Sequence, residues 1–257
     1  MPELRVFYGD YSPEMLLADL HIHTTRSDGW WEPERLADAA VARGLSAIGI
    51  TDHDDIAAGF AVADAAAKRG LPLSVYVGQE ISAREEGHDV HVLGLDLTDE
   101  IHPWQSIAAT VDAILKQEGF AIMPHPRAAG RGLPTFEQIL ALDMPVAVEI
   151  YNASMVDLKR LRDRSLPDAN DEARAFYQAN RERLAGAVGG TDAHFRTIGR
   201  GLTAYRGDLR EAIARRETAV LYLPERERLR PWDPVGYVRG LRRLDRRRSE
   251  KYGPRPR

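Results

Sequence analysis

Short apolar runs alternate along the chain with longer stretches rich in alanine, leucine, arginine and glutamate, and this alternation predicts repeated strand–helix units. Most of the runs are continuously apolar, which is typical of strands buried on both faces of a mainly parallel sheet. Seven strands within about 200 residues favour an α/β fold with a closed or distorted β/α barrel, and an open doubly wound sheet is the alternative. The expected strands are residues 15–18, 46–51, 73–77, 89–97, 120–123, 146–150 and 185–190.

Helices are predicted between most of these strands, and three of them are followed by glycine, a residue that commonly ends a helix. One direct strand-to-strand step is expected between Glu80 and His91. The expected helices are residues 33–43, 55–69 and 104–118, a helix after Pro134, and a long polar helical region over 155–184.

The chain divides by composition into residues 1–223, which contain no linker, and an arginine-rich tail, 224–257. Apolar residues at helical spacing predict that the tail forms a docked amphipathic helix with a solvated basic face. An arm that binds a polyanion is the alternative. The apolar positions are Val235, Val238, Leu241 and Leu244.

Charge and cysteine usage narrow the class of protein. The net charge is −4, which by itself argues neither for nor against a polyanionic partner. The chain has no cysteine, which excludes disulfides and cysteine-ligated zinc. No basic-then-apolar signal pattern opens the chain, and no apolar run reaches the ~18 residues that span a bilayer. We therefore expect a cytoplasmic protein with no membrane partner.

Ionisable residues gather at the carboxyl ends of the predicted strands, the edge at which β/α barrels build their sites. His21 and His23 are two residues apart, so both side chains project from the same face of a strand. Six of the eight histidines are at such ends or, like His91, inside a strand. A buried cluster of this kind is costly without a cation. The candidate metal ligands are His21, His23, Asp28, His53, Glu80, His91, His125, Asp192 and His194.

Nine ligands are too many for one ion with ~4–6 ligands, so two or three divalent ions are expected, with Glu80 as the bridging carboxylate. Imidazole and carboxylate donors suit zinc, manganese or iron. Such clusters produce hydroxide from water near neutral pH and bind the attacking and leaving oxygens of an in-line displacement. This chemistry indicates hydrolysis of a phosphoester by a metal-bridging hydroxide.

Six motifs in register extend the argument: DLHIHTTRSDG, ITDHD, GQEIS, HVLGL, MPHP and GGTDAH. Together they resemble the PHP (polymerase and histidinol phosphatase) superfamily, and they are most similar to its stand-alone metal-dependent phosphoesterases. The resemblance implies a distorted seven-stranded, TIM-like β/α barrel with a trinuclear metal centre.

The resemblance also implies how the ligands divide among three ions, and every expected ligand position is occupied. The first ion would be held by His21, His23, Glu80 and Asp192, the second by Glu80, His91 and His125, and the third by Asp28, His53 and His194.

One departure from the family pattern concerns the substrate. Family members that act on nucleoside 3′,5′-bisphosphates and RNA ends have a helical insertion between the HVLGL-like strand and the HP motif. Here only about 30 residues separate His91 from His125, so the cover over the substrate is reduced.

Other residues near the motifs have candidate roles. Arg127, Arg196 and Arg200 are expected to bind phosphate, since guanidinium groups match phosphate oxygens; pairing with surface carboxylates is the alternative. Trp30 and Trp31 are expected to be packing residues rather than a stacking platform. Asp19, Asp52 and Asp54 flank ligand positions and could orient them or serve as caps.

The leading hypothesis is a metal-dependent phosphoesterase that acts on a small phosphorylated molecule, with a nucleotide as one such substrate. The alternatives are a metallohydrolase of an amide or carbamate ester, an exonuclease-type enzyme to which the basic tail brings nucleic acid, and a non-enzymatic metal-binding scaffold. Nucleic acid is not the favoured partner.

Overall fold

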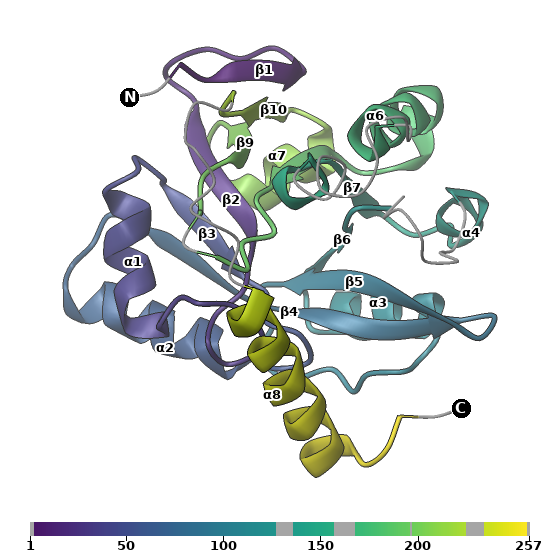
Figure 1. The fold of residues 1–257 in the computed structure, drawn as a ribbon. Coiled ribbons are helices and arrows are strands. Elements are labelled where there is room, and N and C mark those ends of the chain that lie inside the picture. The colour runs from purple at the N-terminus through teal and green to yellow at the C-terminus, as the bar shows by residue number, and fades with distance from the viewer. Residues whose placement is uncertain (1–2, 127–135, 157–167, 196, 225–233, 256–257) are drawn as a thin grey trace.

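The computed structural model describes residues 3–126, 136–156, 168–195, 197–224 and 234–255. Within these ranges ten strands form one sheet, and helices cover its outer side (Figure 1). The strands are β1 (Arg5–Tyr8), β2 (Leu16–Ile22), β3 (Ala47–Ile50), β4 (Ser74–Glu85), β5 (His88–Leu95), β6 (Phe120–Met123), β7 (Val146–Asn152), β8 (Ala187–Gly190), β9 (Gly201–Tyr205) and β10 (Ala219–Tyr222). The helices are α1 (Pro33–Val41), α2 (Ala57–Lys68), α3 (Ile107–Lys116), α4 (Phe136–Ala141), α6 (Ala169–Asn180), the 3₁₀ turn η1 (Arg181–Arg183), α7 (Leu209–Arg215) and α8 (Pro234–Tyr252).

The sheet is strongly curled and has the strand order β1-β10-β9-β2-β3-β4-β5-β6-β7-β8. Backbone hydrogen bonds join its two distant parts: the His23 N–H donates to Ala193 O at 3.2 Å, and the Ala193 N–H donates to His21 O at 3.2 Å. The end of β2 therefore lies beside the loop that follows β8. This contact brings ligand motifs from opposite ends of the sequence to one rim.

Two details of the predicted sheet are wrong. It has ten strands rather than seven, because β1, β9 and β10 add an antiparallel extension beside β2. It is mixed rather than mainly parallel, because β4 and β5 form an antiparallel hairpin and β6 pairs antiparallel with β5. The expected strand-to-strand step is that hairpin. The three extra strands are short and become stable by pairing with distant segments, which local apolar patterns do not report.

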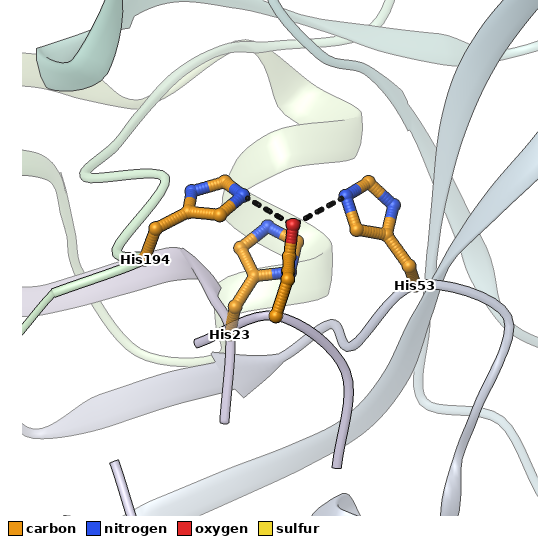
Figure 2. Close-up of side chains that lie close together, drawn as sticks. His23, His53 and His194 are labelled. Atoms are coloured by element: carbon orange, nitrogen blue, oxygen red, sulfur yellow. Dashed lines mark ion pairs between the residues drawn. The ribbon is translucent and has the colours of Figure 1, made fainter. Parts of the chain in front are cut away.

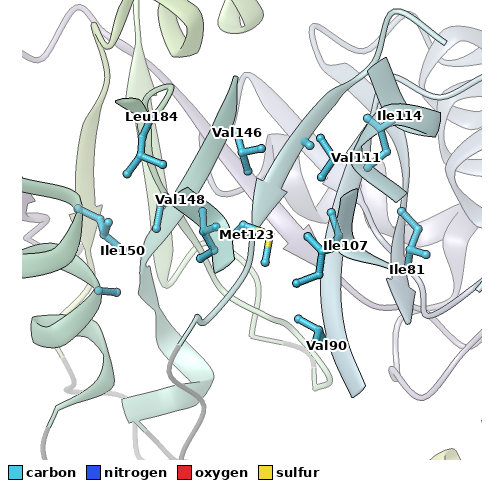
Figure 3. Packing of buried hydrophobic residues seen from close by; sticks show 14 of the residues in the cluster. Ile81, Val90, Ile107, Val111, Ile114, Met123, Val146, Val148, Ile150 and Leu184 are labelled. Carbon is cyan, nitrogen blue, oxygen red and sulfur yellow. The ribbon is translucent and has the colours of Figure 1, made fainter. Parts of the chain in front are cut away.

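The core beside the metal-ligand strands is formed by α3 packed on β4 and β5. Ile107 and Ile114 of α3 are buried against residues such as Ile81 (Figure 3). The helix begins at Ser106, whose Oγ accepts a hydrogen bond from the Ala109 N–H at 3.2 Å. A Cβ at Gly94 of β5 would lie 2.9 Å from the Ile114 side chain, so glycine permits this close approach.

The tail forms a helix, as predicted, with Leu244 buried. Figure 1 shows α8 beside the β4–β5 hairpin rather than extended into solvent. None of the helices within the described ranges combines the length and apolar character that crossing a membrane requires.

Candidate metal centre

The Glu80 carboxylate lies at the middle of the ligand cluster and is 1% exposed. Its two oxygens face five imidazole rings that come from four separate parts of the chain. Oε2 lies 3.3 Å from His21 Nε2, 3.1 Å from His23 Nε2 and 3.3 Å from His53 Nδ1, and Oε1 lies 2.6 Å from His91 Nδ1 and 3.2 Å from His125 Nε2. One carboxylate thus faces five rings, three at one oxygen and two at the other.

A second carboxylate, that of Asp28, faces the other side of the cluster. Its Oδ2 lies 3.2 Å from His194 Nε2 and 3.7 Å from His53 Nε2. Figure 2 shows these two rings turned toward a common carboxylate oxygen, with His23 between them. His23 Nδ1 lies 3.6 Å from Asp28 Oδ1.

Asp192 completes the arrangement and links the two sides. Its Oδ1 lies 3.2 Å from His23 Nε2, 3.5 Å from His21 Nε2 and 3.2 Å from His194 Nδ1. All nine residues selected from the sequence therefore come together. Four groups have ligand atoms within 4.8 Å of one another: His23, Asp28, His53 and His194; His21, Glu80 and His125; His21, His23 and Asp192; and His53, Glu80 and His91.

Several of these atoms fit a cation better than they fit one another. Both ring nitrogens of His23, Nδ1 of His53 and Oδ1 of Asp192 are buried and make no hydrogen bond among the described residues. These atoms nevertheless lie close to one another, as His23 Nε2 and Asp192 Oδ1 do. Buried polar atoms without hydrogen-bond partners are costly, and a cation between them would satisfy their lone pairs. The imidazole and carboxylate donors fit a centre of several divalent ions.

The carboxylates and imidazoles of the metal-free cluster shift one another's pKa values strongly. Burial alone would raise the pKa of Glu80, but His53, His91 and His21 outweigh it and hold the pKa well below its usual range. Burial lowers the pKa of His53 well below its usual range, although Glu80 and Asp28 act in the opposite direction. For His194, burial opposes the charge, but Asp28 and Asp192 raise the pKa well above its usual range.

The backbone is strained at two ligand positions. His125 has φ of 29° and Asp192 has φ of 54°, both in the left-handed region that residues with a side chain rarely adopt. Such residues cost about 1–3 kcal/mol each and persist only where surrounding contacts hold them. For His125 one such contact is its N–H, which donates to Glu149 Oε2 at 2.9 Å. For Asp192 one is its carbonyl, which accepts from Ser154 Oγ at 2.7 Å.

Glu149 is a functional residue that the sequence analysis missed. It is 2% exposed, and its Oε1 lies 3.1 Å from His21 Nδ1, so it orients the ring whose other nitrogen faces Glu80. Its Oε2 also accepts from Asn152 Nδ2 at 2.9 Å, and the same amide group lies 3.2 Å from Asp192 Oδ2. The available signal was a single carboxylate inside the otherwise apolar strand β7.

Two of the flanking aspartates fix ligand loops rather than ligand rings. Asp52 accepts from the backbone N–H groups of Thr24 and Ser27 at 2.8 and 3.1 Å, and also from both hydroxyls, so it fixes the loop that leads to Asp28. Asp19 accepts from the Thr191 and Gly199 N–H groups at 2.9 and 2.7 Å and so holds the loop that carries Asp192. Burial raises the pKa of Asp19 to about 6.

The third flanking aspartate, Asp54, has a different partner. Its Oδ2 lies 2.5 Å from Nε of Arg248 on α8, and its Oδ1 accepts from the Ser82 N–H at 2.7 Å. It therefore joins the C-terminal helix to β4.

The structure describes one of the three arginines that the sequence suggested as phosphate-binding residues. Arg127 and Arg196 lie outside the described residues. Arg200 is described, and its backbone N–H donates to Thr191 Oγ1 at 2.9 Å, so it lies next to the Asp192 loop.

The two tryptophans have separate environments. Trp31 packs against the core that includes Leu36. Trp30 makes an edge-to-face contact with Phe195, with 5.1 Å between ring centroids.

Comparison with known proteins agrees with this geometry. Residues 19–215 match the model of the PHP domain, which is most of the chain. The chain belongs to the PHP family. The predicted family resemblance is therefore confirmed.

Relatives within the family include nucleotide- and RNA-processing enzymes. A segment of 88 residues is 42% identical to the 5′-3′ exoribonuclease Rnm of Salmonella typhimurium and covers 34% of this chain and 30% of that protein. A segment of 79 residues is 39% identical to the 3′,5′-nucleoside bisphosphate phosphatase of Chromobacterium violaceum and covers 31% of this chain and 27% of that protein. The matches thus span under a third of the length of these relatives.

A solved structure shares the fold over most of the chain. It is a two-domain protein from Bacteroides vulgatus that contains a predicted PHP-like metal-dependent phosphoesterase. The match has a TM-score of 0.63 at 21% identity and covers 81% of this chain and 65% of that one. At this identity the likeness establishes the fold alone.

Proposed function

We propose that the protein is a metal-dependent phosphoesterase that hydrolyses a small phosphorylated substrate, with a nucleotide as the favoured class. The observation that carries the proposal is the position of the Glu80 carboxylate between two groups of imidazole rings, with Asp28 and Asp192 beside them. Membership of the PHP family supports the reaction class. The relatives named for nucleoside bisphosphates and for RNA support the substrate class.

The ligands are proposed to divide among three ions, and Glu80 is shared between two of them. His23 supports a compact centre in particular, because its Nε2 faces Glu80 and Asp192 while its Nδ1 faces Asp28. The proposed sets are His21, His23, Glu80 and Asp192; Glu80, His91 and His125; and Asp28, His53 and His194.

The chain's own residues would hold and orient the reacting groups. When bound, the ions would activate water as the nucleophile and neutralise negative charge on the phosphoryl oxygens. Glu149 keeps the His21 ring in place, and Asp52 and Asp19 fix the two ligand loops. Arg200 is proposed to bind phosphate beside the Asp192 loop, and Arg127 and Arg196 keep the same proposed role.

A second candidate is an exonuclease-type reaction on RNA. The observation that favours it is the 42% identity to an exoribonuclease over 88 residues. Both candidates use the same metal centre and differ in whether the substrate is a monomer or a polymer.

Elemental analysis of freshly purified protein, combined with a phosphate-release screen, tests the proposal. The screen would contain sugar phosphates, amino-acid phosphates, nucleoside phosphates and short 5′-phosphorylated RNA. We expect two or three equivalents of divalent ion and release of phosphate or nucleotide that stops after chelation. If the protein contains its metals but cleaves none of these substrates, the proposal is overturned and a carbonyl substrate is favoured.

A further inference from the structure

A cavity of about 670 Å³ lies between the β4–β5 hairpin and α8. His91 lines it, and His91 Nδ1 lies 2.6 Å from Glu80 Oε1, so the cavity adjoins the metal centre directly. Its volume is in the range that holds a small ligand. Because the opposite wall is formed by Arg248 and Ser249 of α8, the C-terminal helix is part of this space.

Trp104 lines the same cavity and has an unusual backbone. Its φ of 66° places a bulky side chain in the left-handed region, which is a rare outlier outside turns and strained sites. Its N–H donates to Ser82 O at 2.6 Å, and its ring packs edge-to-face with Tyr252 of α8 at 6.1 Å between centroids. Strain of this kind gathers at ligand-binding positions, and the metal-ligand position His125 has it as well.

Arg248 gives the cavity a guanidinium group whose position is fixed by two contacts. Its Nε lies 2.5 Å from Asp54 Oδ2, and its Nη2 donates to Ser82 Oγ at 2.5 Å. The side chain is 21% exposed. These contacts use only part of the five N–H donors of a guanidinium group, and the rest can serve an anionic or carbonyl group of a ligand.

We propose that this cavity is the subsite for the ring of a nucleotide whose phosphate is cleaved at the metal centre. The base or sugar packs on Trp104, and a polar group of the nucleotide meets Arg248. This inference rests on the proposed phosphoesterase function and adds the substrate class and the residues that select it. In this assignment α8 takes over part of the cover that the short segment between His91 and His125 does not provide.

Two phosphate monoesters test the subsite, one with a base and one without: adenosine 5′-monophosphate and glycerol 3-phosphate. Base–aromatic stacking is lost in Trp104→Ala, so kcat/KM for adenosine monophosphate should fall about tenfold more than kcat/KM for glycerol 3-phosphate. The Kd of adenosine monophosphate, measured by calorimetry, should rise by a similar factor. Phe60→Ala, an exposed aromatic on α2, is the matched control and should change neither value.

A second variant fills the space instead of emptying it. Ser249→Trp should weaken binding of adenosine monophosphate about tenfold or more with the metal content unchanged, whereas Glu250→Trp on the neighbouring exposed position should not. Equal effects on both phosphate esters, or no effect of either cavity variant, would overturn the subsite. Failure of the wild-type protein to release any phosphate would refute the proposed function. The Kd of adenosine monophosphate, measured by calorimetry, would still show whether the cavity binds the nucleotide.

A separate set of contacts joins α8 to the loop that carries Asp28. Arg243 Nε donates to Ser27 O at 2.8 Å, and its Nη2 donates to Gly29 O at 3.2 Å. Arg247 donates to Arg26 O. A Cβ at Gly240 would lie 2.9 Å from Asp28 O, so the helix rests directly on the loop backbone.

We infer that Arg243 is a positioning residue for the metal ligand Asp28. The two carbonyls it binds flank Asp28 on both sides, so the guanidinium group fixes the direction in which the carboxylate points. Outer residues of this kind change metal affinity 10- to 100-fold when they are removed.

Elemental analysis of the purified protein tests this role without relying on activity. Arg243→Ala should weaken binding of one ion 10- to 100-fold and leave the ions of the Glu80 groups bound, and Arg243→Lys should restore part of the loss. Arg242→Ala, on an exposed position of α8, is the matched control. Full retention of metal in Arg243→Ala, or equal loss from all groups, would overturn the inference. Wild-type protein without divalent ions would instead refute the metal centre itself.

Discussion

The two sides of the candidate metal centre are built differently. On one side, Glu80 and His91 lie within the β4–β5 hairpin and His21 lies within β2, so the sheet itself fixes these ligands. On the other side, Asp28 and His194 lie on loops, and separate polar contacts hold those loops. We therefore expect changes on the sheet side to affect the whole candidate centre, and changes on the loop side to affect only the group around Asp28 and His194.

Glu80→Gln should have the largest effect, because it removes the shared ligand of the sheet side. We expect loss of more than one ion and a fall in kcat of roughly a thousandfold or more, beyond the 10- to 100-fold that outer residues cost. Metal content and phosphate release would be measured together. Glu86→Gln at the exposed hairpin turn is the control. Turnover close to wild type in Glu80→Gln would refute the bridging role.

Asp52→Asn should act on the loop side only. The amide cannot accept all four hydrogen bonds from Thr24 and Ser27, so the loop before Asp28 should loosen. We expect one ion to bind 10- to 100-fold more weakly, measured by titration with a divalent metal. Asp64→Asn on the exposed face of α2 serves as the control. Equal weakening of every ion would mean that the two sides are not separable.

Gly190→Ala tests how tightly the sheet side is packed. A Cβ there would lie 2.4 Å from Glu149 Oε1 and 2.7 Å from His21 Cβ. We expect a loss of about 1–3 kcal/mol in the free energy of unfolding, measured with denaturant, together with weaker metal binding, because the strand has no room to yield. Gly70→Ala, whose Cβ meets no atom within 4 Å, should leave metal binding unchanged. Unchanged stability and metal content in Gly190→Ala would show that the strand can yield there.

The pH dependence of metal binding should give the smallest effect. Burial opposes the charge on His21, but Asp192, Glu149 and Glu80 raise its pKa well above the usual value, and His194 is raised in a similar way. Protonation of both rings therefore stabilises the metal-free protein below the unfolded pKa, and this contribution is lost as pH rises through the folded pKa. Bound metal excludes these protons, so metal affinity should increase with pH.

Thermal unfolding with and without metal measures this linkage. From pH 6 to pH 8 the gain in Tm on adding metal should grow, by roughly 2–4 °C for each 1 kcal/mol of added binding free energy in a chain of this size. A gain that shrinks over the same range would contradict the assigned charge states.

Sequence patterns predicted the residues of the candidate metal centre more completely than the strands of the sheet. His21, His53 and Asp192 could be selected because each follows an apolar run, and parallel strands end at one rim whatever their order. The strands β9 and β10 could not be found in the same way, since their stability comes from pairing with β2 and β1. Glu149 was missed because its role depends on the position of His21, 128 residues earlier in the chain.

The C-terminal tail shows the same limit of prediction from local sequence patterns. Its helical spacing predicted α8, and its many arginines left open whether it binds a polyanion or docks. The structure places Arg243 on the loop carbonyls and Arg248 on Asp54, and no local pattern in the sequence contains these contacts.

The sequence alone determined which side chains are available to bind metal, because donor chemistry and the strand-end positions are local properties. The tertiary structure decided which of them face the same carboxylate oxygen, which aspartates fix the loops, and where α8 lies. Those features depend on distances between residues far apart in the chain, and only the curled sheet sets such distances.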